Sequence, residues 1–269
     1  MELSVYEQFA KLEEDHFWFQ GRRTIFFDLI ERSFGESGSS PNGRQAERQI
    51  LEVGCGAGGM LGPLGRFGNV TGIDISHDYI QFCANRGHRR VVTGSGYELP
   101  FQDNSFDMVA LFDVIEHIED DIRVLGEVRR VLKPGGRVFL SVPAYQFLFS
   151  QNDRVAHHLR RYTAGRLDST LRCAGLKSSK LTYFNTFLFP LILPAVLVLK
   201  LKEKLFGLPK GLTNLSHQFK EPVNSIFAWI MGTERWLLRH IDLPFGHSLI
   251  AMGSREQLAR GLGATSCRP

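Results

Sequence analysis

Short apolar runs alternate with longer stretches of mixed polarity through the middle of the chain. Five runs between residues 49 and 142 have the length of β-strands, and two more follow further along. The predicted strands are 50–53, 70–74, 90–93, 106–112, 137–142, 176–184 and 248–252. Such alternation is typical of a parallel sheet with helices on both faces, so the pattern predicts an α/β core.

The segments outside this alternation differ from it in pattern. Residues 1–33 place apolar side chains at helical spacing and end in a Gly/Ser/Pro/Asn-rich linker at 35–43, which predicts an N-terminal helical arm. The sequence from 253 onwards has no apolar period, which is typical of a frayed tail. The expected organisation is an arm and linker at 1–48, a core at 49–186, a hydrophobic helical insertion at 187–245, and a last strand with flexible tail at 246–269.

Charge and cysteine content narrow the class of protein only a little. The formal net charge is +4, but the lysines and arginines are scattered among 28 acidic residues. We therefore expect no nucleic-acid partner. The four cysteines form no C-x-x-C pair and indicate neither a disulfide framework nor a zinc site. The acidic N-terminus does not resemble a secretory signal. These features favour a cytoplasmic protein.

A glycine-rich turn follows the first predicted strand. Residues 51–59 read L-E-V-G-C-G-A-G-G and satisfy G-x-G-x-x-G through Gly54, Gly56 and Gly59. Glycines here let the backbone leave the strand sharply and remove side chains that would keep a nucleotide from the main chain. By itself the motif also fits a nicotinamide-dependent dehydrogenase.

Two carboxylates near this turn separate the alternatives. Glu52 precedes the first glycine by two positions, where it can hold the ammonium group of a methionine moiety but would repel a pyrophosphate. Asp74 closes the second predicted strand, where an acid can accept both ribose hydroxyls. The sequence contains no Tyr-x-x-x-Lys pair of a short-chain dehydrogenase. A methionine-derived nucleotide is therefore favoured over a dinucleotide.

Three further motifs follow in order: L-P-F-Q-D-N-S-F-D at 99–107, F-D-V-I-E-H at 112–117 and L-K-P-G-G at 132–136. With the glycine turn, they make residues 49–145 resemble the class I S-adenosylmethionine-dependent methyltransferases, especially the small-molecule branch that includes quinone and lipid methyltransferases. The resemblance implies a Rossmann-like sheet of seven strands in the order 3-2-1-4-5-7-6, with the last strand antiparallel. It also implies S-adenosyl-L-methionine as the cofactor.

The resemblance assigns cofactor contacts position by position. The glycine turn would face the methionine part, Asp74 the ribose, and Ile75 one face of the adenine. Where the family often has an acid that accepts from the adenine amino group, Ser95 stands, and its hydroxyl can still accept that bond. His117 would either contact the methionine end or pack below the cofactor. The expected cofactor residues are Glu52, Gly54, Cys55, Gly56, Asp74, Ile75, Ser95, Gly96, Phe112, Asp113 and His117.

The segment past the fifth predicted strand carries the candidate catalytic residues. Residues 151–163 read Q-N-D-R-V-A-H-H-L-R-R-Y-T, a dense group of ionisable side chains. If this segment is helical, Asp153 and His157 share one face, so the acid could orient a histidine base, and His158 pairs with Tyr162. The alternative is a polar helix of solvated charges. The candidates are Tyr145, Asp153, His157 and His158.

Basic and aromatic residues in two segments are candidates for holding the acceptor. Arg160 and Arg161 could clamp a phosphate or carboxylate on it. The stretch D-H-F-W-F-Q-G-R-R-T at 15–24 could form a lid, although core packing is the favoured explanation for its aromatic residues. The expected acceptor contacts are Trp18, Arg22, Arg160, Arg161 and Tyr162. No paired-acid ligand set is evident, so we expect no metal.

The sequence therefore predicts an enzyme that methylates a hydrophobic or lipid-linked small molecule, at oxygen, with a histidine or simple desolvation removing the proton. Two alternatives remain open. One is an NAD(P)-dependent oxidoreductase that uses the same glycine turn, and the other is a non-catalytic protein on a methyltransferase scaffold. The oligomeric state is not indicated.

The predicted insertion has the features of a membrane-surface element. Every residue from 187 to 199 is apolar, which falls short of the roughly 18 to 20 residues that a spanning helix needs. Lys200, Lys202, Lys204 and Lys210 follow, and residues 223–241 place a second apolar face beside two tryptophans. Such faces favour the lipid headgroup region, so we expect peripheral binding at the inner membrane face or to an acyl chain. The alternative is a cap over the acceptor pocket.

Overall fold

The computed structural model describes residues 10–35, 48–206 and 219–255. The chain divides into two compact units: the first contains residues 1–39, 142–163 and 182–249, and the second contains residues 40–141, 164–181 and 250–269. The expected arm and the expected insertion thus belong to one unit, together with the segment that carries the candidate histidines. The expected linker, Lys210 and nearly all of the expected tail lie outside the described residues.

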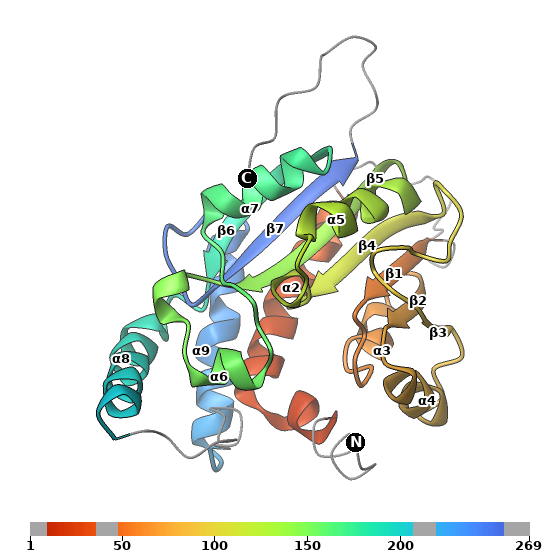
Figure 1. Ribbon diagram of the computed structural model, residues 1–269. Helices are drawn as coiled ribbons and strands as arrows, with labels where there is room; N and C mark the ends of the chain where they lie inside the picture. The colour runs from red at the N-terminus through yellow and green to blue at the C-terminus, as the bar shows by residue number, and fades with distance from the viewer. Residues whose placement is uncertain (1–9, 36–47, 207–218, 256–269) are drawn as a thin grey trace. The chain divides into compact units, whose positions relative to one another are not determined.

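A seven-stranded sheet has the strand order β3-β2-β1-β4-β5-β7-β6. Neighbouring strands from β3 across to β5 are parallel, and the last strand, β7, runs antiparallel (Figure 1). The predicted fold class and strand order are therefore confirmed. The strands are β1 (Gln49–Val53), β2 (Asn69–Asp74), β3 (Val91–Thr93), β4 (Phe106–Phe112), β5 (Leu132–Pro143), β6 (Leu176–Phe184) and β7 (Ser248–Arg255).

The central strands are buried on both faces, as their nearly continuous apolar sequences require. In β1 the side chains of Ile50 and Leu51 have no exposed surface, and in β4 the same holds for Val109 and Leu111. β5 begins earlier than expected, because the backbone pairs with β4 from Leu132 through an irregular register. The P-G-G stretch, which precedes the predicted strand at 137–142, therefore lies within β5.

Two helices of the second unit, α4 and α5, begin at side chains that cap them. Helix α4 (His77–Asn85) starts after Ser76, whose hydroxyl accepts from the backbone N–H of Tyr79. Helix α5 (Asp121–Val131) starts after Asp120, which accepts from the N–H of Arg123 at 2.9 Å. The remaining helical elements of this unit are α3 (Leu61–Leu64), η2 (Ile115–His117) and α7 (Ala164–Cys173).

The cysteines differ from one another in state. Cys55 and Cys83 are free and buried, as expected. Cys173, in α7, is disulfide-bonded, although the spacing of the cysteines indicated no disulfide framework.

The first unit is helical for the most part, and two helices far apart in the sequence pack against each other in it. The side chain of Asn224 accepts from the backbone N–H of Phe17 at 2.8 Å. Gly21 lies so close to Met231 that an added Cβ would be 2.9 Å from that side chain. The helical elements are α2 (Phe17–Gly35), η3 (Gln146–Leu148), α6 (Gln151–Val155), α8 (Phe189–Phe206) and α9 (Val223–Leu238). Within the described ranges, no helix combines the length and hydropathy needed to cross a membrane.

Candidate functional site

The glycine turn leaves β1 in a conformation that only glycine adopts without strain. Gly54 has φ +72°, and a Cβ on it would come within 2.7 Å of a methyl group of Val114. The carbonyl oxygen of Ile73, in β2, accepts from the N–H groups of Gly54 at 2.7 Å and Cys55 at 3.1 Å. The turn is thus fixed by β2 on one side and by Val114 on the other. No feature of the sequence singled out Val114.

Gly56 presents open backbone at the tip of this turn. It has φ +50°, and a Cβ there would meet no atom within 4 Å. Its N–H donates to Oδ2 of Asp74 at 2.9 Å, and its carbonyl accepts from the thiol of Cys83 at 3.3 Å. Gly56 therefore has a fixed orientation and leaves room for a ligand above it.

Asp74 is held in position by backbone groups on both of its oxygens. Oδ2 accepts from Gly56, and Oδ1 accepts from the N–H of Ser76 at 2.9 Å. A carboxylate offers about four acceptor sites, so two remain for hydroxyl donors. The next residue, Ile75, has 78% of its surface exposed. A carboxylate edge beside an exposed apolar side chain suits a ribose with an attached flat base.

Cys55 and Glu52 lie beneath the turn. The hydrogen bond with Cys83 and burial raise the pKa of the Cys55 thiol far above its usual range, so the side chain stays protonated and unreactive. Glu52 is buried, with 3% of its surface exposed.

The expected contacts after β3 and β4 lie in turns of the same unit. The hydroxyl oxygen of Ser95 accepts from the N–H of Tyr97 at 3.2 Å. Asp113 has φ +56°, and its Oδ1 accepts from the hydroxyl of Ser141 at 2.9 Å. Phe112 is buried, Gly96 is half-buried and His117 is exposed. The turn, the Asp74 edge and the exposed Ile75 together fit an adenosyl group attached to an amino acid.

The first unit brings two other predicted polar residues, His158 and Arg161, into contact with Asp153. Arg161 donates from Nε to Oδ1 at 2.7 Å and from a terminal nitrogen to Oδ2 at 3.0 Å. Nδ1 of His158 lies 2.8 Å from Oδ1, and the N–H of Ser150 donates to Oδ2 at 2.8 Å. The Asp153 side chain has no exposed surface. Asp153 therefore orients both the arginine and the histidine.

The charge state of Asp153 follows from these contacts. Burial alone would raise its pKa, but the hydrogen bonds from His158 and Arg161 and the positive charge of Arg161 outweigh burial. They hold the pKa of Asp153 well below its usual range. The carboxylate is therefore ionised at neutral pH.

The predicted helical pairing of Asp153 with His157 is wrong. Helix α6 ends at Val155, and His157 takes a left-handed backbone conformation with φ +60°. The turn carries the chain back, so that His158 faces Asp153 instead, while His157 is exposed. His158 and Tyr162 do not lie in one helix either.

Tyr145 has an unusual backbone and a half-buried ring. Its φ is +61°, and its ring stacks on that of Tyr183 with centroids 5.1 Å apart. Burial, together with a hydrogen bond to Tyr183, raises the pKa of Tyr145 to about 12. The phenol is thus protonated at neutral pH, which suits a hydrogen-bond donor rather than a base.

The predicted acceptor contacts have different surroundings. Arg161 is committed to Asp153 and to the carbonyl of Ala144, and Tyr162 is fully buried. Trp18 is half-buried and stacks on Phe184 at 6.0 Å. Arg22 is buried with its guanidinium 4.5 Å from the centroid of the Phe19 ring, and Arg160 is half-buried.

One buried acid in the first unit was not singled out by the sequence. Glu234, in α9, accepts from the N–H of Phe187 at 2.8 Å, and its Oε2 has no hydrogen-bond partner in the described part of the chain. Burial raises the pKa of Glu234 to about 7. In the sequence this residue stands among ordinary helical positions, where nothing shows that it faces the interior.

Comparison with known proteins finds similarity in the part of the second unit that carries the glycine turn. Residues 51–140 match the family model described as a methyltransferase domain. A protein of Mycolicibacterium smegmatis named as a probable S-adenosylmethionine-dependent methyltransferase is 30% identical over 172 residues, which cover 62% of each chain. Demethylmenaquinone methyltransferase of Staphylococcus aureus is 38% identical over 98 residues, covering 34% of this chain and 41% of that protein.

A solved structure supports the same fold. A protein of Galdieria sulphuraria, provisionally assigned as a sarcosine dimethylglycine methyltransferase, has a TM-score of 0.56 at 18% identity and covers 87% of this chain and 86% of its own. The chain spans 62–63% of the length of the first curated relatives that it matches. The match confirms the expected methyltransferase domain at residues 51–140, and the solved structure supports its fold.

Proposed function

We propose that this chain, with its methyltransferase domain at residues 51–140, transfers the methyl group of S-adenosylmethionine to a hydrophobic small molecule of the quinone or lipid-linked class. The observation that carries the proposal is the Asp74 carboxylate, fixed beside the open glycine turn and the exposed Ile75. The quinone class is taken from the demethylmenaquinone methyltransferase to which the chain is similar.

The cofactor, when bound, supplies a methyl group on a positively charged sulfur that a nucleophile displaces. The protein then has to hold the nucleotide and orient the acceptor, because in-line alignment and exclusion of water provide much of the rate. Asp74 and the glycine turn serve the first task. An ionised Glu52 beneath the turn would favour the cationic methionine end.

For an oxygen acceptor we assign proton removal to His158. With Nδ1–H donated to the ionised Asp153, the imidazole has its acceptor lone pair on Nε2, the arrangement of an acid-oriented histidine base. His157 has no such carboxylate in its described surroundings. The phenol of Tyr145 is suited to donating a hydrogen bond to the acceptor oxygen.

We further propose that α8 and α9 contact a membrane surface or an acyl chain. Along α8, Leu191, Leu201 and Leu205 have 57–64% of their surface exposed. The opposite side of α8 packs on residues 145–148 through Phe189 and Val196. Exposed leucines followed by lysines suit insertion into the headgroup region of a bilayer. Sedimentation with anionic vesicles at low salt tests this: a chain that stays in the supernatant would refute membrane binding.

The test of methyl transfer uses S-adenosylmethionine labelled in its methyl group. The protein is incubated with demethylated quinones and with a fractionated lipid extract, and labelled products are identified by mass. We expect label in a hydrophobic hydroxyl compound. Binding of NAD(P) in place of S-adenosylmethionine would favour the oxidoreductase alternative. Cofactor binding without transfer to any fraction would favour a non-catalytic scaffold.

A further inference from the structure

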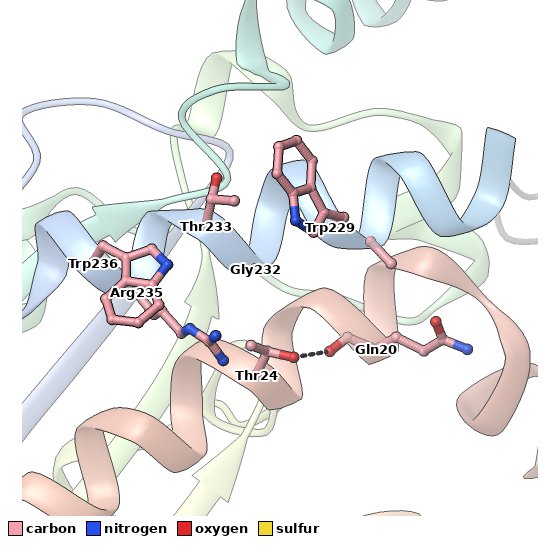
Figure 2. A pocket seen from close by; sticks show the side chains of 8 residues that line it. Gln20, Thr24, Trp229, Gly232, Thr233, Arg235 and Trp236 are labelled. Atoms are coloured by element: carbon pink, nitrogen blue, oxygen red, sulfur yellow. Dashed lines mark hydrogen bonds between the residues drawn. The ribbon is translucent and has the colours of Figure 1, made fainter. Parts of the chain in front are cut away.

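A pocket of about 290 Å³ lies between α2 and α9 in the first unit (Figure 2). Gln20 and Thr24 line it from α2, and Trp229, Thr233, Arg235 and Trp236 line it from α9. Its size is at the lower end of small-molecule sites, which suits a small polar group with a few attached carbon atoms. The pocket is not part of the glycine turn or of the Asp153 cluster.

Arg235 is the charged group of this pocket, and its donors are not used. The Nε atom is buried and has no hydrogen-bond partner among the residues that the structure describes. Within the described ranges no ion pair of Arg235 is seen either. Figure 2 shows the side chain extending from α9 toward Thr24. Because a buried unsatisfied donor is costly, this arrangement favours a ligand that accepts hydrogen bonds.

The stacking of Arg235 leaves its donors available. Its guanidinium carbon lies 4.8 Å from the centroid of the Trp236 ring. A guanidinium stacked on an aromatic ring keeps its N–H groups at its edge, where they can bind an oxyanion in fork geometry. The hydroxyls of Thr24 and Thr233 donate to the carbonyls of Gln20 and Ile230, and the amide of Gln20 also donates to backbone carbonyls, so the contact with an oxyanion rests on Arg235.

Asp28, the carboxylate that pairs with Arg239 beside Trp236, already binds two other arginines. Asp28 accepts from Nε of Arg239 at 3.0 Å and also pairs with Arg32 at 3.5 Å. Arg239 itself lies over Trp236, with its guanidinium carbon 4.1 Å from the ring centroid. The positive charge of Arg235 is therefore not neutralised by Asp28, and the pocket favours an anion.

Two exposed tryptophans border the pocket. Trp229 has 70% and Trp236 has 52% of its surface exposed, and Ile226, one turn before Trp229, has 48% exposed. Aromatic side chains of this kind contact the carbon atoms of a ligand or the interface of a bilayer. A ligand that satisfies both features has an oxyanion attached to an apolar part.

We propose that the pocket between α2 and α9 binds a phosphate group, held by the fork of Arg235 and carried either by a lipid headgroup or by a soluble phosphate ester. This site is independent of methyl transfer, since none of its residues belongs to the proposed cofactor or proton-transfer groups. If the pocket binds no phosphate, the proposed methyl transfer is unaffected.

The test measures binding of two probes by the full chain at about 0.15 M salt. Glycerol phosphate is titrated by calorimetry, and vesicles of phosphatidylcholine with or without phosphatidic acid are used in co-sedimentation. The variants are Arg235→Gln, Arg235→Lys and, as the matched control for loss of one positive charge, Arg172→Gln in α7, whose side chain is 67% exposed. Thermal melting of each variant checks folding.

For the lipid phosphate and for the soluble phosphate ester alike, we expect Arg235→Gln to weaken binding by about 10- to 100-fold, because a charge-assisted contact is lost. Arg172→Gln should bind as the natural chain does. Arg235→Lys keeps the charge without the fork and should fold and bind with intermediate strength. Preference for vesicles that contain phosphatidic acid identifies the lipid source, and binding of glycerol phosphate without that preference identifies the soluble source. No binding of either probe, or equal effects of the Arg235 and Arg172 variants, would overturn the proposal.

Discussion

Replacing Asp74 by alanine is the sharpest test of the cofactor site. The substitution removes the acceptor that we propose for two ribose hydroxyls and leaves the N–H groups of Gly56 and Ser76 without their partner. A hydrogen bond to a charged group contributes about 1.5 to 3 kcal/mol. Because Asp74 is half-buried, water screens part of this, and the lower end applies: two bonds give about 3 kcal/mol. We therefore expect the Kd for S-adenosylmethionine to rise on the order of 100-fold.

The assay is titration calorimetry with S-adenosylmethionine, and the control is Asp103→Ala in the same unit. The side chain of Asp103 is 65% exposed and pairs only at the surface with Arg130, so its loss should leave the Kd unchanged. Denaturant unfolding separates loss of the ligand contact from loss of the turn. A Kd for Asp74→Ala within twofold of that of the natural chain would refute the ribose assignment.

The remaining predictions concern the first unit. His158→Gln should lower turnover by a factor of about 10² to 10⁴ and leave the Kd for the cofactor unchanged, whereas the His157→Gln variant should be as active as the natural chain. Full activity of both variants between pH 6 and 9 would show that no histidine base is needed. Asp153→Ala leaves the charge of Arg161 buried, so urea unfolding at pH 7 should show a loss of about 3 to 5 kcal/mol. Because folding lowers the pKa of Asp153, its contribution to the free energy of unfolding is present above the ordinary pKa of 3.8 and is lost as the pH falls below that value. The difference in unfolding free energy between Asp153→Ala and the natural chain should therefore shrink at pH 3. Because the pKa of Glu234 is raised from 4.5 to about 7, the natural chain should lose about 3 kcal/mol of stability as the pH rises between these values, and Glu234→Gln should show a flatter profile; parallel profiles would contradict the burial argument.

The sheet and the cofactor turn could be predicted because they depend on local signals. Apolar runs of strand length, the glycines after β1 and an acid at the end of β2 are all read from neighbouring residues. The order of the strands, by contrast, came from the resemblance to a family. The start of β5 was missed because a P-G-G sequence normally marks a turn, and here it is absorbed by an irregular register with β4.

The Asp153 cluster was predicted in part. The sequence indicated that Asp153 orients a histidine, but helical spacing selected the wrong partner, because nothing in the residue types shows that α6 ends after Val155. The left-handed backbone of His157 is set by tertiary contacts. The same limit applies to Arg235 and Glu234: adjacent in the sequence, one lines a pocket and the other is buried, and only packing distinguishes them.

The packing of α2 on α9 has a consequence for synthesis of the chain on the ribosome. Buried residues of α2 include Ile25, Phe26 and Ile30, yet the helix that packs against it begins at Val223, 188 residues after α2 ends at Gly35. At roughly 5 to 20 residues per second, the nascent α2 waits on the order of 10 to 40 s for this partner. The first unit can therefore be completed only after α9 has been synthesised, and fragments that stop before α9 leave the apolar side of α2 without its packing surface.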